Sequence, residues 1–189
     1  MTGHAARCWW LGVFVVIGTS APPARAEIVV NGGFETGNFF PWTVPQIALP
    51  PNPNPSLFFV SGGGGHSGDF YGRLSSLNLQ FMSQVLPTVA GTDYELSFWL
   101  RVPDLLLGHA FTVRWEGQSV FTQFVPQVPW TRFSLPLHSN ITGSFLQFGQ
   151  SAFPGEYHID DISVVQVPAP SPAALLGVAG LLALRRKRR

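Results

Sequence analysis

Polar and apolar residues alternate with a period of two in several short stretches of this 189-residue chain, and this period constrains the fold more than any other feature. In the clearest stretch, 92–101, apolar side chains fall on one side and a set that includes Trp99 and Arg101 falls on the other. Further strands are predicted at 109–117, 132–137, 144–150 and 158–165. Glycine and proline separate them, no βαβ alternation is visible, and an all-β antiparallel sandwich is therefore predicted.

Two long stretches between the predicted strands are dense in turn-forming residues. Residues 43–56 are rich in proline and predict a stiff loop, and residues 61–69 are rich in glycine. Loops at one end of a sandwich often carry function, but each of these two can equally be a plain surface connection.

The first 26 residues have the layout of a secretory signal peptide. A basic residue, Arg7, precedes an apolar run, and the small-x-small site 24–26 precedes Glu27. The alternative, a buried first helix, conflicts with the proline pair 22–23. We therefore expect cleavage by signal peptidase after residue 26 and a β domain over residues 27–166.

The last 23 residues form a separate tail, 167–189, in which an apolar run stands between prolines and five basic residues. The run 173–184 would span about 18 Å as a helix, against a hydrocarbon core of about 30 Å, so it is a weak transmembrane segment. The basic cluster would stay cytoplasmic, which leaves the domain outside. A plain stop-transfer anchor is the alternative interpretation.

This tail resembles a PEP-CTERM sorting signal of Gram-negative bacteria, on the motif Val167, Pro168, Ala169 and Pro170 followed by the apolar run and the arginines. The resemblance implies transient anchoring in the inner membrane, cleavage by an exosortase, and release to the cell surface or the surroundings. Ala169 stands where the family has glutamate, and whether it permits cleavage is left open.

The charges of the chain are segregated between its ends and its middle. Residues 27–167 hold four arginines, no lysine and all ten carboxylates, a net charge of −6. Nucleic acid is therefore excluded as an expected partner. The single cysteine, Cys8, lies in the signal peptide, so the mature domain has no disulfide.

Acidic residues near the first and last segments of the domain suggest a metal site. Glu35 follows a glycine pair, Asp160 and Asp161 lie in the last predicted strand, and Asp69 closes the glycine-rich loop. Oxygen ligands of this kind suit Ca²⁺. Strict alternation favours Asp160, because it would share a face with the buried Ile162. The alternative is that these acids are ordinary surface or capping residues.

Five motifs resemble, in order, the pattern of carbohydrate-binding modules and galactose-binding-like jelly rolls: NGGFETGNFFPW, HSGDFYGRL, YELSFWLR, WTRFSL and YHIDDISV. The resemblance covers most of residues 28–165. It implies a jelly-roll sandwich with a structural Ca²⁺ held by Glu35, Asp69 and Asp160.

No catalytic constellation is predicted. Asp160 and Asp161 would point to opposite faces of one strand and could not flank a glycosidic bond together. The histidines are scattered, and no G-x-S-x-G nucleophile motif occurs. We therefore expect a protein that is not an enzyme, and a glycan-active enzyme is the least favoured alternative.

Outward aromatic and basic side chains predict a sugar-binding surface instead. The candidates are Trp99, Arg101 and Arg114 on predicted strands and Trp42 at a strand border, although Trp42 and Trp130 are more often core or rim residues in this kind of sandwich. The leading hypothesis is an exported, exosortase-sorted protein of the cell surface or matrix that associates with extracellular polysaccharide. The alternative is a specific, lectin-like carbohydrate-binding module.

Overall fold

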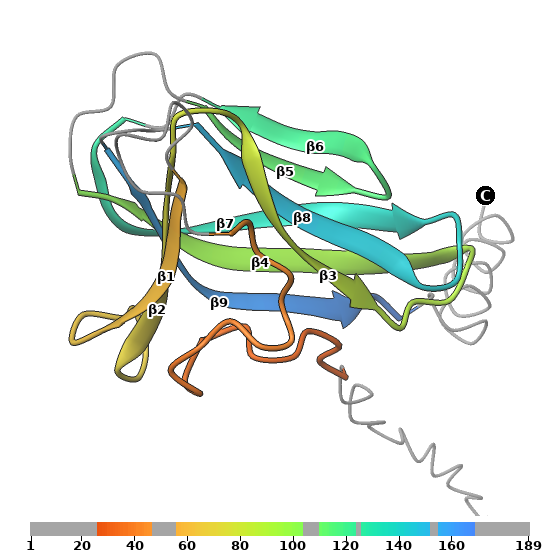
Figure 1. Ribbon diagram of the computed structural model, residues 1–189. Coiled ribbons are helices and arrows are strands. Elements are labelled where there is room, and N and C mark those ends of the chain that lie inside the picture. Colours follow the sequence, from red (N-terminus) through yellow and green to blue (C-terminus); the bar gives the residue numbers. More distant parts are fainter. Residues whose placement is uncertain (1–25, 47–55, 104–109, 124–125, 152–154, 169–189) are drawn as a thin grey trace, which may run out of the picture.

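The computed structural model describes residues 26–46, 56–103, 110–123, 126–151 and 155–168, and this part of the chain forms two antiparallel sheets packed as a β-sandwich (Figure 1). The five-stranded sheet has the order β1 (Ser56–Gly62), β2 (Phe70–Ser76), β9 (Tyr157–Gln166), β4 (Thr92–Val102) and β7 (Val128–Ser139). The four-stranded sheet has the order β3 (Gln80–Leu86), β8 (Ser144–Gln150), β5 (Phe111–Trp115) and β6 (Gln118–Gln123). All neighbouring strands run antiparallel, as the sequence predicts.

The core lies between the inner faces of the two sheets. Phe98 of β4 is fully buried and contacts the rings of Phe111 and Phe148 in the opposite sheet, with ring centroids 5.9 and 5.3 Å apart. Its neighbours Leu96 and Leu100 are also fully buried. The period of two therefore places one side of β4 in the core and leaves the other side as an outer face.

The five predicted strands correspond to β4, β5, β7, β8 and β9. The segment 144–150 has the same bounds as β8, whereas β7 begins four residues before the predicted start at 132. Strands β1, β2, β3 and β6 were not predicted. β6 is almost entirely exposed, so it lacks the apolar half of the alternating pattern.

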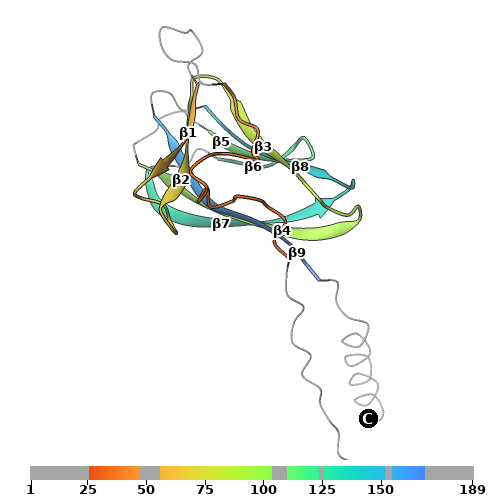
Figure 2. The same cartoon turned by 60° about the horizontal axis from the view of Figure 1, so that its bottom comes forward.

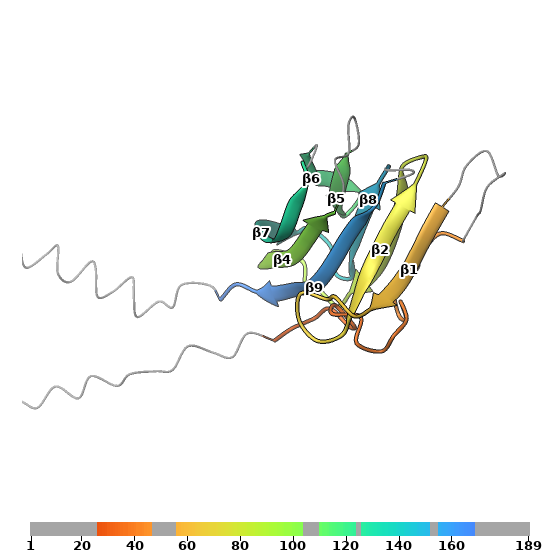
Figure 3. The same ribbon diagram turned by 90° about the vertical axis from the view of Figure 1, so that its left-hand side faces the viewer.

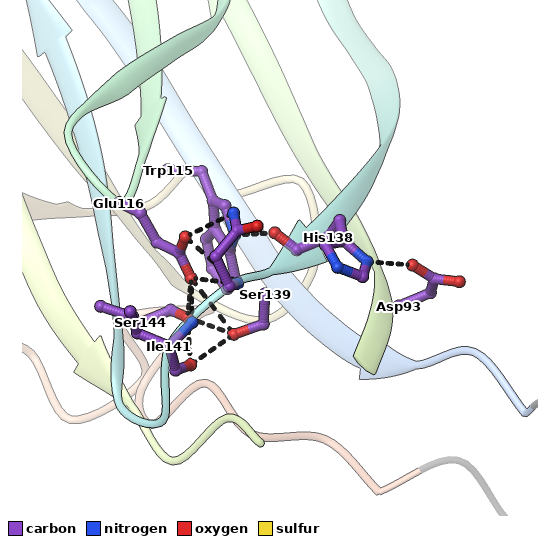
Figure 4. A network of polar contacts seen from close by, with 8 residues as sticks. Asp93, Trp115, Glu116, His138, Ser139, Ile141 and Ser144 are labelled. Carbon is purple, nitrogen blue, oxygen red and sulfur yellow. Dashed lines mark hydrogen bonds and ion pairs between the residues drawn. The ribbon is translucent and has the colours of Figure 1, made fainter. Parts of the chain in front are cut away.

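Strands β5 and β6 are joined by a two-residue turn whose residues, Glu116 and Gly117, have φ values of 51° and 80°. Two consecutive positive φ values match the right-handed twist of a hairpin. The Glu116 carboxylate reaches the turn between β7 and β8 and accepts hydrogen bonds there from Asn140 and Ser144 (Figure 4).

The two ends of the described domain lie side by side, as expected for a jelly roll (Figure 2). Glu27 pairs with Val165 of β9, and the N–H of Ile28 donates to the carbonyl of Val164 at 3.1 Å. Within the described residues, no helix has the length and hydropathy needed to cross a bilayer. The predicted signal peptide and apolar tail, including Ala169 and Pro170, lie outside these residues.

Candidate functional site

An extra residue in β9 interrupts the alternation of side chains at Asp161. Trp99 of β4 pairs with Asp160, whereas Ser97, two residues away, pairs with Ser163. Between these two pairs, two residues of β9 lie opposite one residue of β4, which is the pattern of a β-bulge. Asp161 has a φ of 47°, in the left-handed region.

The bulge places Asp160 on the outer face of the five-stranded sheet. Directly paired residues share a face of the sheet, so Asp160 lies on the same face as Trp99. The buried Leu100 lies on the other face. The prediction that Asp160 shares the inner face of Ile162 is wrong, because the bulge shifts the alternation by one residue. Asp160 is nevertheless 0% exposed, because the loop 63–69 covers it.

Both aspartates hold this loop. The carboxylate of Asp160 accepts the backbone N–H of His66 at 2.7 Å and of Ser67 at 3.4 Å. The carboxylate of Asp161 accepts the Ser67 hydroxyl at 2.6 Å, and its other oxygen lies 2.6 Å from Nδ1 of His66. The two side chains therefore reach the same two loop residues, and the prediction that they diverge is wrong. Burial raises the pKa of Asp160 to about 6.

The residues predicted to bind calcium surround the same loop. Glu35 accepts the backbone N–H groups of Asp69 at 3.2 Å and Phe70 at 3.0 Å. Asp69 thus contributes its backbone, while its side chain is exposed. A methyl group at Gly33 would lie 3.4 Å from Oδ1 of Asp161 and 3.7 Å from Oδ1 of Asp160, so acidic oxygens border a small space there. In the described part of the chain, no three acidic, histidine or cysteine side chains form a group that could hold a metal ion.

The loop also brings aromatic rings together on the outer face. The His66 ring stacks on Trp99, with centroids 3.5 Å apart and an interplanar angle of 14°. Nε1 of Trp130 donates to the Gly64 carbonyl at 3.2 Å, and the Trp130 ring meets Tyr71 edge-on at 5.8 Å. Tyr71, Trp99 and Trp130 come from β2, β4 and β7, three strands of one sheet (Figure 3). All three side chains remain partly exposed.

A hollow of about 520 Å³ adjoins this aromatic group. It is lined by residues 101–103 at the end of β4 and 127–130 at the start of β7, so Arg101 and Trp130 share it. We call the outward surface of the five-stranded sheet the aromatic face; its residues are Tyr71, Trp99, Arg101, Trp130, Arg132 and His158.

A partly buried ion pair borders the aromatic face at β2 and β9. Arg73 donates to one oxygen of Glu156, and Nε2 of His158 lies 2.6 Å from the other. Burial raises the pKa of Glu156, but the hydrogen bonds and charges of His158 and Arg73 outweigh burial and hold that pKa below its usual value. Both carboxylate oxygens of Glu156 therefore already have partners within the fold.

The structure brings together two of the four residues predicted to bind sugar. Trp99 and Arg101 lie on the aromatic face, whereas Arg114 lies on β5 in the other sheet, with its guanidinium over the Phe81 ring at 4.4 Å. Trp42 is only 5% exposed and packs in the core, where Nε1 donates to the Asn31 carbonyl. It is not available for stacking on a ligand.

Trp130 and Tyr71 were not predicted to belong to the ligand surface. The alternation of Trp130 with Arg132 on β7 could have indicated the first, had that strand been extended to 128. Tyr71 lies in β2, which was not predicted.

Solved carbohydrate-binding modules resemble this structure over most of the domain. A family 61 module in complex with β-1,4-galactotriose has a TM-score of 0.54 at 19% identity, covering 75% of this chain and 99% of that one. A xylan-binding domain of family 22 has a TM-score of 0.54 at 14% identity, covering 79% and 100%. A family 16 module has a TM-score of 0.54 at 15% identity, covering 73% and 99%. This chain has the jelly-roll fold of these modules.

Some similar structures are longer chains, and this chain matches only a part of each of them. In the Clostridium thermocellum xylanase 10B fragment with a family 22 and a GH10 module, the match has a TM-score of 0.57 at 14% identity and covers 29% of that chain. No protein-family model and no curated protein sequence matches this chain.

Proposed function

We propose that this domain is a non-catalytic carbohydrate-binding module that binds polysaccharide through the aromatic face. The observation that carries the proposal is the gathering of Tyr71, Trp99 and Trp130 from three strands beside a hollow that also contains Arg101. Aromatic rings stack on the apolar faces of sugars, and nearby donors bind the hydroxyl groups. Structural neighbours in complex with galactotriose or named as xylan-binding support this proposal.

The loop 63–69 fixes the geometry of this binding surface. His66 covers one side of Trp99, and the Gly64 carbonyl fixes the orientation of the Trp130 indole. A platform that is ordered before the ligand arrives loses less conformational entropy on binding. The loop is therefore part of the proposed site and more than a connection.

Affinity electrophoresis of the protein in gels containing soluble galactan or xylan tests the proposal. Wild type should be retarded by at least one polysaccharide, and Trp99→Ala should migrate as it does in a gel without polysaccharide. Trp42→Phe is the control, because it changes a tryptophan of the core. Unretarded wild type in every gel, or a retarded Trp99→Ala, would contradict the proposal.

Export and sorting form a separate part of the proposal. A signal peptide over 1–26 and a PEP-CTERM-like tail over 167–189 would deliver the domain to the surface of a Gram-negative cell through an exosortase, where it would associate with extracellular polysaccharide. The mass of the mature protein, from cells that hold an exosortase, should lack both segments. A mature protein that keeps residues 171–189 would argue for a permanent anchor, and Ala169→Glu would then show whether this residue blocks cleavage.

A structural Ca²⁺ near the loop 63–69 is also proposed, with Glu35 and Asp160, which both hold this loop, as carboxylate ligands. Asp69 would take part through its exposed side chain only after rearrangement. Its role would be to hold the loop, with no part in catalysis. EDTA should lower the melting temperature of wild type and leave that of Glu35→Ala unchanged. An equal melting temperature of wild type with EDTA and with Ca²⁺ would overturn this assignment.

A further inference from the structure

The geometry points to an acidic polysaccharide as the ligand, with the carboxylate of a uronic acid unit held by Arg101 in the hollow beside Trp130. This inference rests on the proposed function and adds the charge of the ligand to it.

Two guanidinium groups of the aromatic face have no ionic partner among the described residues. In the part of the chain that the structure describes, neither Arg101 nor Arg132 makes an ion pair or a hydrogen bond through its side chain. Arg132 lies directly opposite Trp99 across β4 and β7, and Arg101 lies opposite His158 across β4 and β9. Both arginines are therefore neighbours of Trp99 on this face: Arg132 lies across the β4–β7 pair, and Arg101 lies two residues along β4.

The carboxylates that face these arginines already have donors within the described part of the fold. Glu156 is bound by Arg73 and His158. Asp161 is bound by Ser67 and His66, Asp160 by backbone N–H groups, and Glu95, further along β4, accepts the Ser134 hydroxyl. Among the described residues of this face, the charged donors without an ion pair are Arg101 and Arg132. Of the three arginines that make no ion pair within the described residues, Arg101 and Arg132 lie at the proposed ligand site, and Arg114 lies over Phe81 on the other sheet.

The hollow has the chemistry to bind a carboxylated sugar. The guanidinium of arginine offers planar paired donors that match both oxygens of a carboxylate. Trp130 lies in the same hollow and can stack on the sugar ring that carries the carboxylate. The Gln127 amide also lines the hollow, and its Nε2 donates to the Pro103 carbonyl at 2.7 Å. Among the described residues that line the hollow, Arg101 is the one that carries a charged donor. At 0.15 M salt the remaining negative charge of the domain is screened beyond about 8 Å.

Matched pairs of polysaccharides test the inference with the full-length protein. We would titrate polygalacturonate, alginate and glucuronoxylan, each before and after reduction of its carboxyl groups to alcohols, at 0.15 M salt. Binding to at least one acidic form should be tenfold or more tighter than to its reduced form. Arg101→Gln should abolish this preference, and Arg101→Lys should restore part of it, because lysine keeps the charge without the fork.

Arg114→Gln is the matched control, since this arginine lies on the other sheet and should leave the preference unchanged. Equal binding of acidic and reduced forms, or a preference that survives Arg101→Gln, would overturn the inference while the proposed function stands. A protein that binds none of these, and neither galactan nor xylan, would overturn both. The comparison of acidic and reduced ligands needs wild type alone, so it tests the inference even if a variant fails to fold.

Discussion

The Glu116 carboxylate should be a major source of stability that depends on pH. It accepts hydrogen bonds from the Ser144 hydroxyl at 2.7 Å and from the side-chain and backbone nitrogens of Asn140 at 2.9 and 3.0 Å (Figure 4). It thereby joins the β5–β6 turn to the β7–β8 turn. Burial raises the pKa of Glu116, but the hydrogen bonds from Asn140, Ser144 and Ile141 outweigh burial, and the pKa lies below its usual value of 4.5.

Glu116→Gln keeps the shape of the side chain and removes its charge. A hydrogen bond to a charged group contributes about 1.5–3 kcal/mol, and one amide oxygen cannot accept all of the bonds that two carboxylate oxygens accept. Discounted for partial exposure, the expected loss in the free energy of unfolding is about 1–3 kcal/mol at pH 7. Glutamine and glutamate differ little in backbone preference, so the φ of 51° at this position should be kept in the variant.

Urea unfolding at several pH values measures this loss. Because the folded pKa is lowered, the carboxylate contributes fully above the unfolded pKa and loses its contribution as the pH falls through the folded pKa. The difference between wild type and Glu116→Gln should therefore be largest at pH 7 and shrink below pH 4.5. Asp93→Asn is the control, since Asp93 pairs with His138 at the surface and should change stability by less than about 1 kcal/mol. A Glu116→Gln difference that does not vary with pH, or does not exceed that of Asp93→Asn, would refute the reasoning.

Three further substitutions test the role of the loop in binding and the contribution of two core residues to stability. Gly68→Ala would place a methyl group 2.4 Å from the Glu35 carboxyl at a φ of 60°, so both the melting temperature and the electrophoretic retardation by polysaccharide should fall; unchanged retardation would contradict the role of the loop. Trp42→Phe should lower stability by about 1–3 kcal/mol in urea unfolding, because it loses buried area and the bond to Asn31, without affecting retardation; weaker retardation would place Trp42 at the site. Phe98→Ala should cost about 3–5 kcal/mol, measured in the same way, because it leaves a cavity between the sheets; a cost below about 1 kcal/mol would argue against the observed packing.

The alternation of side chains predicted the strands that have one face in the core. β4 is the clearest, because every second side chain from Tyr94 to Val102 is buried. β6 could not be recognised in this way, because it is an exposed edge strand. β2 contains Gly72, where a methyl group would lie 3.1 Å from Ile159. Close packing against β9 requires glycine there, and glycine interrupts the apolar pattern by which a strand is recognised.

The candidate site was predicted only as far as the faces of single strands. Alternation indicated that Trp99 and Arg101 point outward, and both lie on the aromatic face. Alternation could not indicate that Arg114 lies on the other sheet, because the pattern within one strand does not determine which strands it pairs with. The bulge at Asp161 is equally invisible to a strict period of two, and for this reason Asp160 was placed on the inner face.

Calorimetric titration of Trp130→Ala against wild type tests the central claim most directly, with the polysaccharide that retards wild type most strongly. Trp130 is the ring that both borders the hollow and contacts Tyr71, so its loss should weaken binding at least tenfold, about 1.4 kcal/mol. Trp42→Phe, measured in parallel, should bind as wild type does. Equal dissociation constants for Trp130→Ala and wild type would contradict the assignment of ligand binding to the aromatic face.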